Sequence, residues 1–164
     1  MENNERKKEI GIKDALVYAK GIINTVHDPI IILQDDLMVA LANGSFYQTF
    51  NVSAKDTEGR FIYDLGNRQW DIPELRCLLE QILPKTTSFD NFKIEHDFLR
   101  LGKRIMLLNA CRIYVKRNRT KLIIITFKDI TERNKIDDLT EKIRELEVQL
   151  KRASQIKVDK ETIN

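Results

Sequence analysis

The chain from residue 122 to 133 reads Leu122-Ile123-Ile124-Ile125-Thr126-Phe127 and then Lys128-Asp129-Ile130-Thr131-Glu132-Arg133. The first part is a β-branched run that is too short for a typical helix, which indicates a buried strand. Beyond Arg133 the apolar residues recur in alternating steps of three and four, which is a helical pattern. Because no Gly or Pro separates the two parts, the sequence predicts a core strand that continues directly into a long helix.

This predicted helix carries a heptad seam, in which apolar residues occupy two positions of each seven-residue repeat. The seam consists of Ile136, Leu139, Ile143, Leu146, Leu150 and Ala153. About three heptads form only a marginal isolated helix, because most helical stability comes from packing. We therefore expect a coiled coil between two copies of the chain, which makes the protein a homodimer. A helix folded back on its own domain is the alternative.

The composition favours a cytoplasmic domain with a surface of mixed charge. The 164 residues include 28 Lys plus Arg and 25 Asp plus Glu, a formal net charge of +3, which does not favour a nucleic-acid partner. Cys77 and Cys111 have no CxxC spacing and the chain has only two histidines, so neither a zinc site nor a disulfide framework is expected. No apolar run approaches the roughly 18 residues of a membrane span, and no signal peptide is evident. We expect no direct membrane insertion.

The N-terminal part of the chain predicts a helix and then a hairpin. Apolar residues from Ile12 to Val26 again step by three and four, which indicates an amphipathic helix. That helix either lies on its own sheet or forms half of a dimer contact. Asp28-Pro29 ends it, because Pro disfavours the helical conformation in the preceding residue. Ile30–Gln34 and Leu37–Ala42 then read as two strands of a hairpin.

The middle of the chain predicts short helices. Asn43 is a suitable N-cap for a helix that follows the hairpin. Gly66 is expected to end a helical turn, because it tolerates the left-handed conformation. Asp71 is the expected N-cap of a helix from Ile72 to Leu83, with Glu74 three residues later in a capping-box pattern. Trp70 is expected to pack as a lid beside that helix.

Three more strands are predicted after the helices. Residues 92–98 alternate between apolar and charged side chains, as in a half-buried strand. Residues 104–115 have apolar side chains at both odd and even positions, and residues 122–130 form the strand described first. The basic run Lys116–Lys121 is expected to be a solvated turn. The result is an α+β fold, a five-stranded antiparallel sheet with helices on one face.

Several motifs of this chain resemble those of the PAS (sensory-box) domain family. They are Ala42-Asn43 followed by Phe46 and Phe50, Glu58-Gly59-Arg60-Phe61, and the closing Asp129-Ile130-Thr131-Glu132-Arg133. A narrower likeness, to a subgroup found in prokaryotic sensor histidine kinases and chemotaxis-type fusion proteins, lies in Gly66–Leu75, Glu95–Phe98 and Met106–Ala110. That subgroup usually has Arg where this chain has Cys111.

The resemblance implies a PAS fold and a division of the chain into three parts. Residues 1–27 would hold a polar lead-in and the amphipathic helix, residues 28–131 the PAS domain, and residues 132–164 a coiled-coil signalling helix with a polar tail. By strand alternation His96 shares the face that should point at any internal cavity. The expected ligand pocket is lined by Phe46, Phe50, Leu79, Phe92, Ile94, His96 and Phe98. A core histidine bonded to a neighbouring group is the alternative for His96.

The resemblance implies that haem or flavin could be held, because PAS domains can bind these groups. The predicted helix from Ile72 to Leu83 has no histidine for haem iron, and no cysteine lies between Gly59 and Trp70 for flavin photochemistry. We predict no covalent or metal cofactor. The expected pocket leaves room for an unidentified small molecule.

The sequence carries no catalytic motif, so a non-catalytic sensor or adaptor is expected. No serine lies in a Gly-x-Ser-x-Gly elbow, no glycine-rich phosphate loop occurs, and no histidine kinase catalytic segment is recognisable. We expect a signal to pass from the core through Asp129, Ile130 and Thr131 into the dimeric coiled coil, in a two-component-type pathway. A histidine kinase or another signalling protein is the expected partner. The alternatives are the detached input region of a sensor histidine kinase and a ligand-free dimerisation scaffold.

Overall fold

The computed structural model describes residues 20–115 and 120–161. It divides into two compact units, Met1–Asp129 and Ile130–Asn164. Most of the predicted N-terminal helix and residues 116–119 of the predicted basic turn lie outside the described residues. Residues 20–24 are helical, and this helix ends before Pro29.

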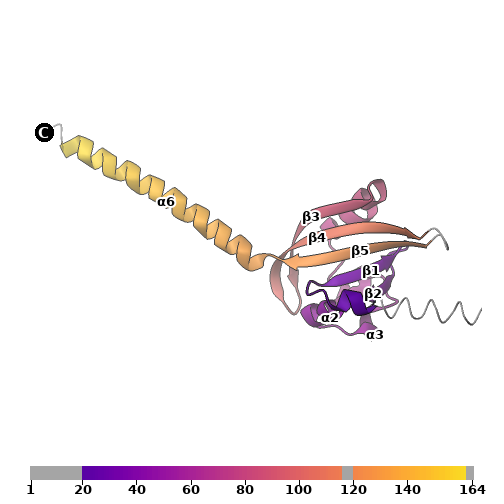
Figure 1. Cartoon of the computed structure of the whole chain (residues 1–164). Coiled ribbons are helices and arrows are strands. Elements are labelled where there is room, and N and C mark those ends of the chain that lie inside the picture. Colours follow the sequence, from indigo (N-terminus) through magenta and orange to yellow (C-terminus); the bar gives the residue numbers. More distant parts are fainter. Residues whose placement is uncertain (1–19, 116–119, 162–164) are drawn as a thin grey trace, which may run out of the picture. The chain divides into compact units, whose positions relative to one another are not determined.

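Five strands form one antiparallel sheet in the order β2-β1-β5-β4-β3 (Figure 1). The strands are β1 Ile30–Gln34, β2 Val39–Ala42, β3 Ser88–Phe98, β4 Gly102–Val115 and β5 Thr120–Asp129. The apolar run predicted as a buried strand is β5, which lies at the centre of the sheet between β1 and β4. The predicted five-stranded antiparallel sheet is thus confirmed.

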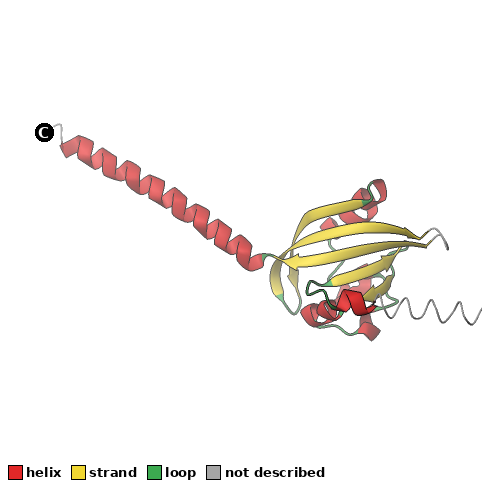
Figure 2. Cartoon of the chain, viewed as in Figure 1, coloured by secondary structure: helices red, strands yellow, loops and turns green. Residues whose placement is uncertain are grey.

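Short helices connect the two halves of the sheet (Figure 2). They are α2 Gly44–Phe50, α3 Ala54–Thr57, η1 Ile62–Asp64, α4 Leu65–Arg68, α5 Pro73–Arg76, η2 Cys77–Ile82 and η3 Leu83–Lys85. Along β5, Ile123, Ile125 and Phe127 are buried, while the residues between them remain partly exposed. The buried set belongs to the same core cluster as Phe46 and Leu75 of the helices. The helices therefore pack on one face of the sheet, because successive strand residues point to opposite faces.

The predicted helix from Ile72 to Leu83 is irregular, and its predicted cap is wrong. It begins as α5, continues as the π-helical η2 and ends as the 3-10 helix η3. The N-cap is Ile72, which makes no side-chain capping bond. Asp71 instead binds two guanidinium groups, Arg76 at 2.5 Å and Arg68 at 2.7 Å. A charge-assisted bond to arginine is stronger than a neutral one, which explains why the carboxylate does not cap the helix.

The predicted role of Asn43 as an N-cap is confirmed, and its side chain connects three segments. It is fully buried, and its side-chain oxygen accepts bonds at 2.9 Å from the amides of Ile30 in β1 and Phe46 in α2. Its side-chain amide donates to the carbonyls of Ile23 and Val26, at 3.1 and 3.2 Å, and also to that of Asp28. One polar side chain thus fixes where the N-terminal helix, the first strand and α2 meet.

Both edges of the sheet are interrupted. On the β3 edge the pairing with β4 shifts register between Phe89 and Phe92. Asn91 in that bulge has a φ of 56°, and its amide donates to the side-chain oxygen of Asn109 at 2.7 Å. Lys93, Glu95 and Asp97 then alternate along the exposed side of β3. The other edge strand, β2, has only four residues, and Met38 before it pairs with Phe61.

The second unit consists mainly of one long helix, α6, which spans Thr131–Glu161 and contains 31 residues. Only Ile130 separates it from β5. The Ile130 carbonyl accepts a bond from the Asn134 amide at 2.8 Å, so helical hydrogen bonding begins at that residue. The predicted direct passage from core strand to helix is confirmed.

Candidate functional site

The space between the sheet and the helices is filled by an aromatic cluster around Trp70. The Trp70 side chain is 1% exposed, and its ring centroid lies 4.6 Å from that of Phe50 and 5.8 Å from that of Phe46. The rings of Phe98 and Phe127, on β3 and β5, each lie 5.2 Å from it. Trp70 is therefore the centre of the core and not the lid that its position before a helix predicted.

The seven residues of the expected ligand pocket lie in several different surroundings. Ile94 and Phe98 are buried in the core, and the His96 ring contacts the Phe98 ring edge-on at 5.0 Å. Phe92 packs against Phe89, and Leu79 lines a separate cavity. Phe46 and Phe50, the other two members of the expected set, both line a cleft described next. The role of the full set in ligand binding stays a prediction.

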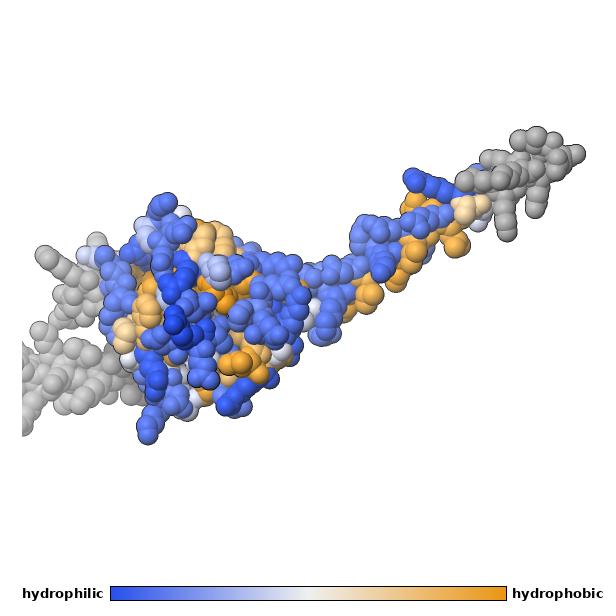
Figure 3. Space-filling model, turned by 180° about the vertical axis from the view of Figure 1, so that it is seen from behind, coloured by the Kyte–Doolittle hydropathy of each residue, from blue (hydrophilic) through white to orange (hydrophobic). Residues whose placement is uncertain are grey.

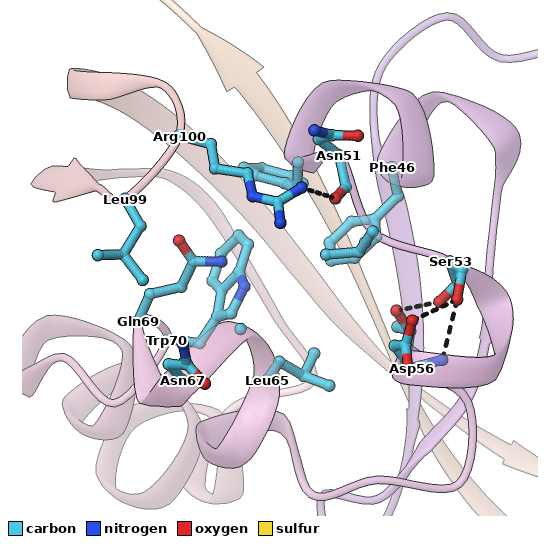
Figure 4. A pocket seen from close by; sticks show the side chains of 14 residues that line it. Phe46, Asn51, Ser53, Asp56, Leu65, Asn67, Gln69, Trp70, Leu99 and Arg100 are labelled. Carbon is cyan, nitrogen blue, oxygen red and sulfur yellow. Dashed lines mark hydrogen bonds between the residues drawn. The ribbon is translucent and has the colours of Figure 1, made fainter.

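A cleft of about 500 Å³ opens beside the aromatic cluster (Figure 4). Three segments form its walls, namely residues 51–57, residues 65–70, and the β3–β4 turn at Leu99 and Arg100. Phe46, Phe50 and Trp70 contribute the aromatic part of its lining. Its volume falls within the range of about 300–1,000 Å³ typical of small-molecule sites. The aromatic core and the cleft therefore share residues.

The first wall is held in place by local hydrogen bonds. Asn51 ends α2 in the left-handed conformation, with a φ of 49°. Ser53 caps α3 by accepting a bond from the Asp56 amide at 3.2 Å, and its hydroxyl donates to the Asp56 carboxylate at 2.6 Å. The Arg100 guanidinium reaches across from the β3–β4 turn and donates to the Asn51 carbonyl at 3.2 Å. Figure 4 shows this bond at one end of the cleft and the Ser53–Asp56 pair at the other.

The second wall contains three consecutive residues in the left-handed conformation. Gly66, Asn67 and Arg68 have φ values of 55°, 58° and 64°. A Cβ at position 66 would meet only the flexible end of the Gln69 side chain, which can move, so it is the φ of 55° that favours glycine there. Left-handed backbone is costly for residues with a Cβ and clusters at functional sites. Gly66 was the sequence signal for this wall, and it predicted the end of a helical turn but not a cleft.

Charged groups surround the Tyr63 ring next to this wall. Hydrogen bonds from Arg76 and then Arg68 hold the pKa of the Asp71 carboxyl below its usual value. The bond to Asp71 raises the pKa of Arg76 in turn. The Arg76 guanidinium also lies 4.1 Å from the centre of the Tyr63 ring, in a cation–π contact. Burial, and then the Glu80 carboxylate, raise the pKa of Tyr63 above its usual value.

The predicted junction residues lie at the end of β5 and the start of α6. Asp129 is the last residue of β5 and forms an ion pair with Arg104 of β4 at 3.3 Å. Ile130 supplies the first helical carbonyl, as described above, and Thr131 is the first residue of α6 and is 7% exposed. The ion pair connects the last residue of the central strand to its neighbour in the sheet.

The predicted heptad seam forms an exposed apolar line on α6. The exposed fractions of Ile136, Leu139, Ile143, Leu146 and Leu150 are 62%, 61%, 57%, 55% and 73%. Figure 3 shows hydrophobic side chains gathered along one side of this helix, with hydrophilic ones beside them. A seam of this kind is typical of a helix that pairs with another helix.

The described residues form neither a metal cluster nor a membrane-spanning helix. None of their His, Cys, Asp and Glu side chains form a group of three or more that could hold a metal ion. Within residues 20–115 and 120–161, the helices are too short or too polar to cross a bilayer.

Comparison with known proteins places the fold. The structure is similar to the PAS domain of BvgS from Bordetella pertussis, with 19% sequence identity and a TM-score of 0.54 over 80% of this chain and 98% of that chain. It is also similar to the PAS domain of nitrogen regulation protein NR(II) from Vibrio parahaemolyticus, with 19% identity and a TM-score of 0.55 over 68% and 97%. At these identities the likeness shows the fold.

A third similar structure is that of the histidine kinase ThkA in complex with the response regulator protein TrrA. The identity is 19% and the TM-score 0.58, and the match covers 78% of this chain but only 36% of that chain. No curated protein matches this chain in sequence. The PAS domain family model matches residues 27–132. The chain therefore belongs to the PAS domain family.

Proposed function

We propose that this PAS protein is a non-catalytic sensor or adaptor that works as a homodimer joined through α6. The exposed seam of α6 carries the proposal. Its five large apolar side chains are each at least 55% exposed, although burying a Leu or Ile side chain is typically worth about 1.5–3 kcal/mol. A second copy of the same helix presents the same heptad spacing, which makes it the natural partner.

The proposed route of the signal follows the covalent chain from core to helix. β5 contributes Phe127 to the aromatic cluster, ends at Asp129, and is followed after one residue by α6. A change in packing around the cluster would shift β5, and the Arg104–Asp129 pair would transmit the shift to the end of the strand. A coupling free energy of about 1–3 kcal/mol is enough to bias a two-state output. Asp129, Ile130 and Thr131 form the junction in this proposal.

The proposed pathway and partner are supported by the proteins in which similar folds occur. Similar structures come from histidine kinases, one of them in complex with a response regulator. We place this chain in a two-component-type pathway in the cytoplasm, where a histidine kinase or another signalling protein is its partner. The chain as the detached input region of such a kinase is the alternative that the same similarity supports.

The filled interior favours a second candidate, a dimerisation scaffold without an internal ligand. Trp70 and four phenylalanine rings occupy the space between sheet and helices, with ring centroids 4.6–5.8 Å from Trp70. In this version the PAS unit contributes a rigid body, and α6 alone determines association.

The dimer is tested by placing a charge in the seam. Ile143→Asp introduces a carboxylate at a seam position in both copies, where pairing would bury it, and burying an unpaired charge is costly. We expect the dimer dissociation constant, measured by sedimentation equilibrium, to rise at least about 100-fold, or about 2.7 kcal/mol. The matched control is Val148→Asp, an equivalent change on the same helix at an exposed residue outside the seam.

The two variants separate seam pairing from general damage to the helix. Circular dichroism shows whether each variant keeps the helical content of the wild type. A wild-type chain that sediments as a monomer at concentrations of about 100 μM would refute the proposal, since the free energy of association would then be weaker than about 5.5 kcal/mol. Equal weakening by both substitutions would show that the seam is not the interface.

A further inference from the structure

The cleft beside the aromatic cluster carries one cationic side chain, Arg100, at its mouth. The guanidinium group has five N–H donors in a planar fork, and one of its nitrogens donates to the Asn51 carbonyl at 3.2 Å. Within the described part of the chain Arg100 makes no ion pair, whereas Arg76, Arg104 and Arg112 each contact a carboxylate. Figure 4 shows the guanidinium between Asn51 and Gln69, above the Trp70 ring. Arg100 is therefore placed to bind an anion in the cleft.

Apolar side chains line this end of the cleft beside Arg100. Trp70 and Leu65 are buried beneath it, and Leu99 beside Arg100 is 70% exposed although its side chain lines the cleft. An apolar ligand group that covered the Leu99 side chain and the neighbouring Trp70 ring would remove apolar surface from water, which is favourable. The amides of Gln69 and Asn67 add hydrogen-bonding groups on the second wall. A ligand that suits these surfaces has one anionic group and an apolar body.

The opposite end of the cleft limits the charge of the ligand. Asp56 lies there, with its carboxylate held by the Ser53 hydroxyl at 2.6 Å. A second negative group on the ligand would approach this carboxylate and be repelled. We propose that the cleft binds a small organic monocarboxylate, with the carboxylate on Arg100 and an aromatic or aliphatic body against Trp70, Leu65 and Leu99. A planar guanidinium suits a carboxylate because the two groups can form paired hydrogen bonds.

The site goes beyond the proposed dimer and does not depend on it, because every lining residue belongs to the first unit. The cleft also contains the only tryptophan of the chain, which provides a direct readout. The probes are phenylacetate and hexanoate, with phenylacetamide and hexanamide as neutral controls of nearly the same shape. Titration is followed by Trp70 fluorescence and by isothermal calorimetry.

We expect at least one of the two acids to bind with a saturable signal and at least about tenfold more tightly than its amide, the usual effect of a hydrogen bond to a charged group. Arg100→Gln should abolish this preference and leave the unfolding temperature within a few degrees of the wild type. Arg60→Gln removes the same charge at an exposed residue outside the cleft and should keep the preference. Ile143→Asp should also keep it, which separates this site from the proposed dimer.

Three results would overturn the monocarboxylate site. One is the absence of saturable binding of either acid up to about 10 mM, which corresponds to a free energy weaker than about 3 kcal/mol. Another is equal affinity for acid and amide in the wild type. The third is an acid preference that Arg100→Gln retains, which would place the anion elsewhere.

Discussion

The interior of the PAS unit and the seam of α6 both consist of large apolar side chains, but those of the interior are buried and those of the seam are exposed. In the interior, Trp70, Phe46 and Phe98 are each 1% exposed and contact one another or shared neighbours. On α6, Ile143 and Leu146 keep more than half of their surface exposed. The comparison teaches that an apolar pattern is satisfied within one chain only when another segment of that chain supplies the opposing face. The seam has a regular pattern and no such segment in its own helix.

The largest effect that distinguishes the two regions is expected from Phe46→Ala. The Phe46 ring contacts those of Phe50, Trp70 and Phe127, and removing a buried phenylalanine ring typically costs about 3–5 kcal/mol. Urea unfolding followed by Trp70 fluorescence measures the loss. Leu139→Ala on the exposed seam should change the unfolding free energy of the PAS unit by less than about 0.5 kcal/mol. Similar losses in the two variants would mean that the seam helps to hold the PAS unit together.

A smaller effect is expected where a polar side chain, and not an apolar one, is buried. Asn43→Ala removes two bonds accepted by the side-chain oxygen and leaves the Ile30 and Phe46 amides without it. We expect a loss of about 2–3 kcal/mol, because buried donors that lose their partners pay their desolvation cost. Ser53→Ala removes the cap of the exposed helix α3 and should cost only about 1 kcal/mol. Equal losses would show that burial adds nothing to the Asn43 cap.

The smallest effect on stability is expected from Asp71, a charged residue at the edge of the core. The pKa of Asp71 in the folded protein lies below its ordinary value of 3.8, chiefly because of the bond to Arg76. Its stabilising contribution is therefore complete above about pH 4 and is lost as pH falls through the folded pKa. Asp71→Asn should lower the melting temperature slightly at pH 7, and the difference from the wild type should shrink as the pH falls below the ordinary value of 3.8. Asp90→Asn removes a carboxylate at an exposed residue of β3 and is the matched control, which should leave the melting temperature at pH 7 unchanged.

Local patterns were sufficient to predict the elements that depend on nearby residues. The β-branched run that forms β5, the Asn43 cap and the heptad spacing of α6 are all set by residues within a few turns of one another. The sheet followed from counting such strands and from the resemblance to a known family. These predictions succeeded because strand and helix periodicity is read directly from the sequence.

The cleft could not be predicted in the same way, because its walls come from segments that are distant in sequence. Arg100 reaches Asn51 across 49 positions, and no local pattern indicates that meeting. Trp70 was misplaced as a lid because its partners Phe98 and Phe127 lie on later strands. Asp71 was assigned to the wrong role because a cap pattern says nothing of two arginines that compete for the carboxylate.

The interrupted edges of the sheet have a consequence for the proposed dimer, in which α6 would join two copies of the chain. Tethering two copies raises the local concentration of each sheet near the other, and free strand edges in that situation can polymerise. The bulge at Asn91 and the charges of Lys93 and Glu95 make β3 a poor template for another strand. In the dimer proposed above, association through α6 is therefore expected to stop at a finite particle and not to continue into fibres.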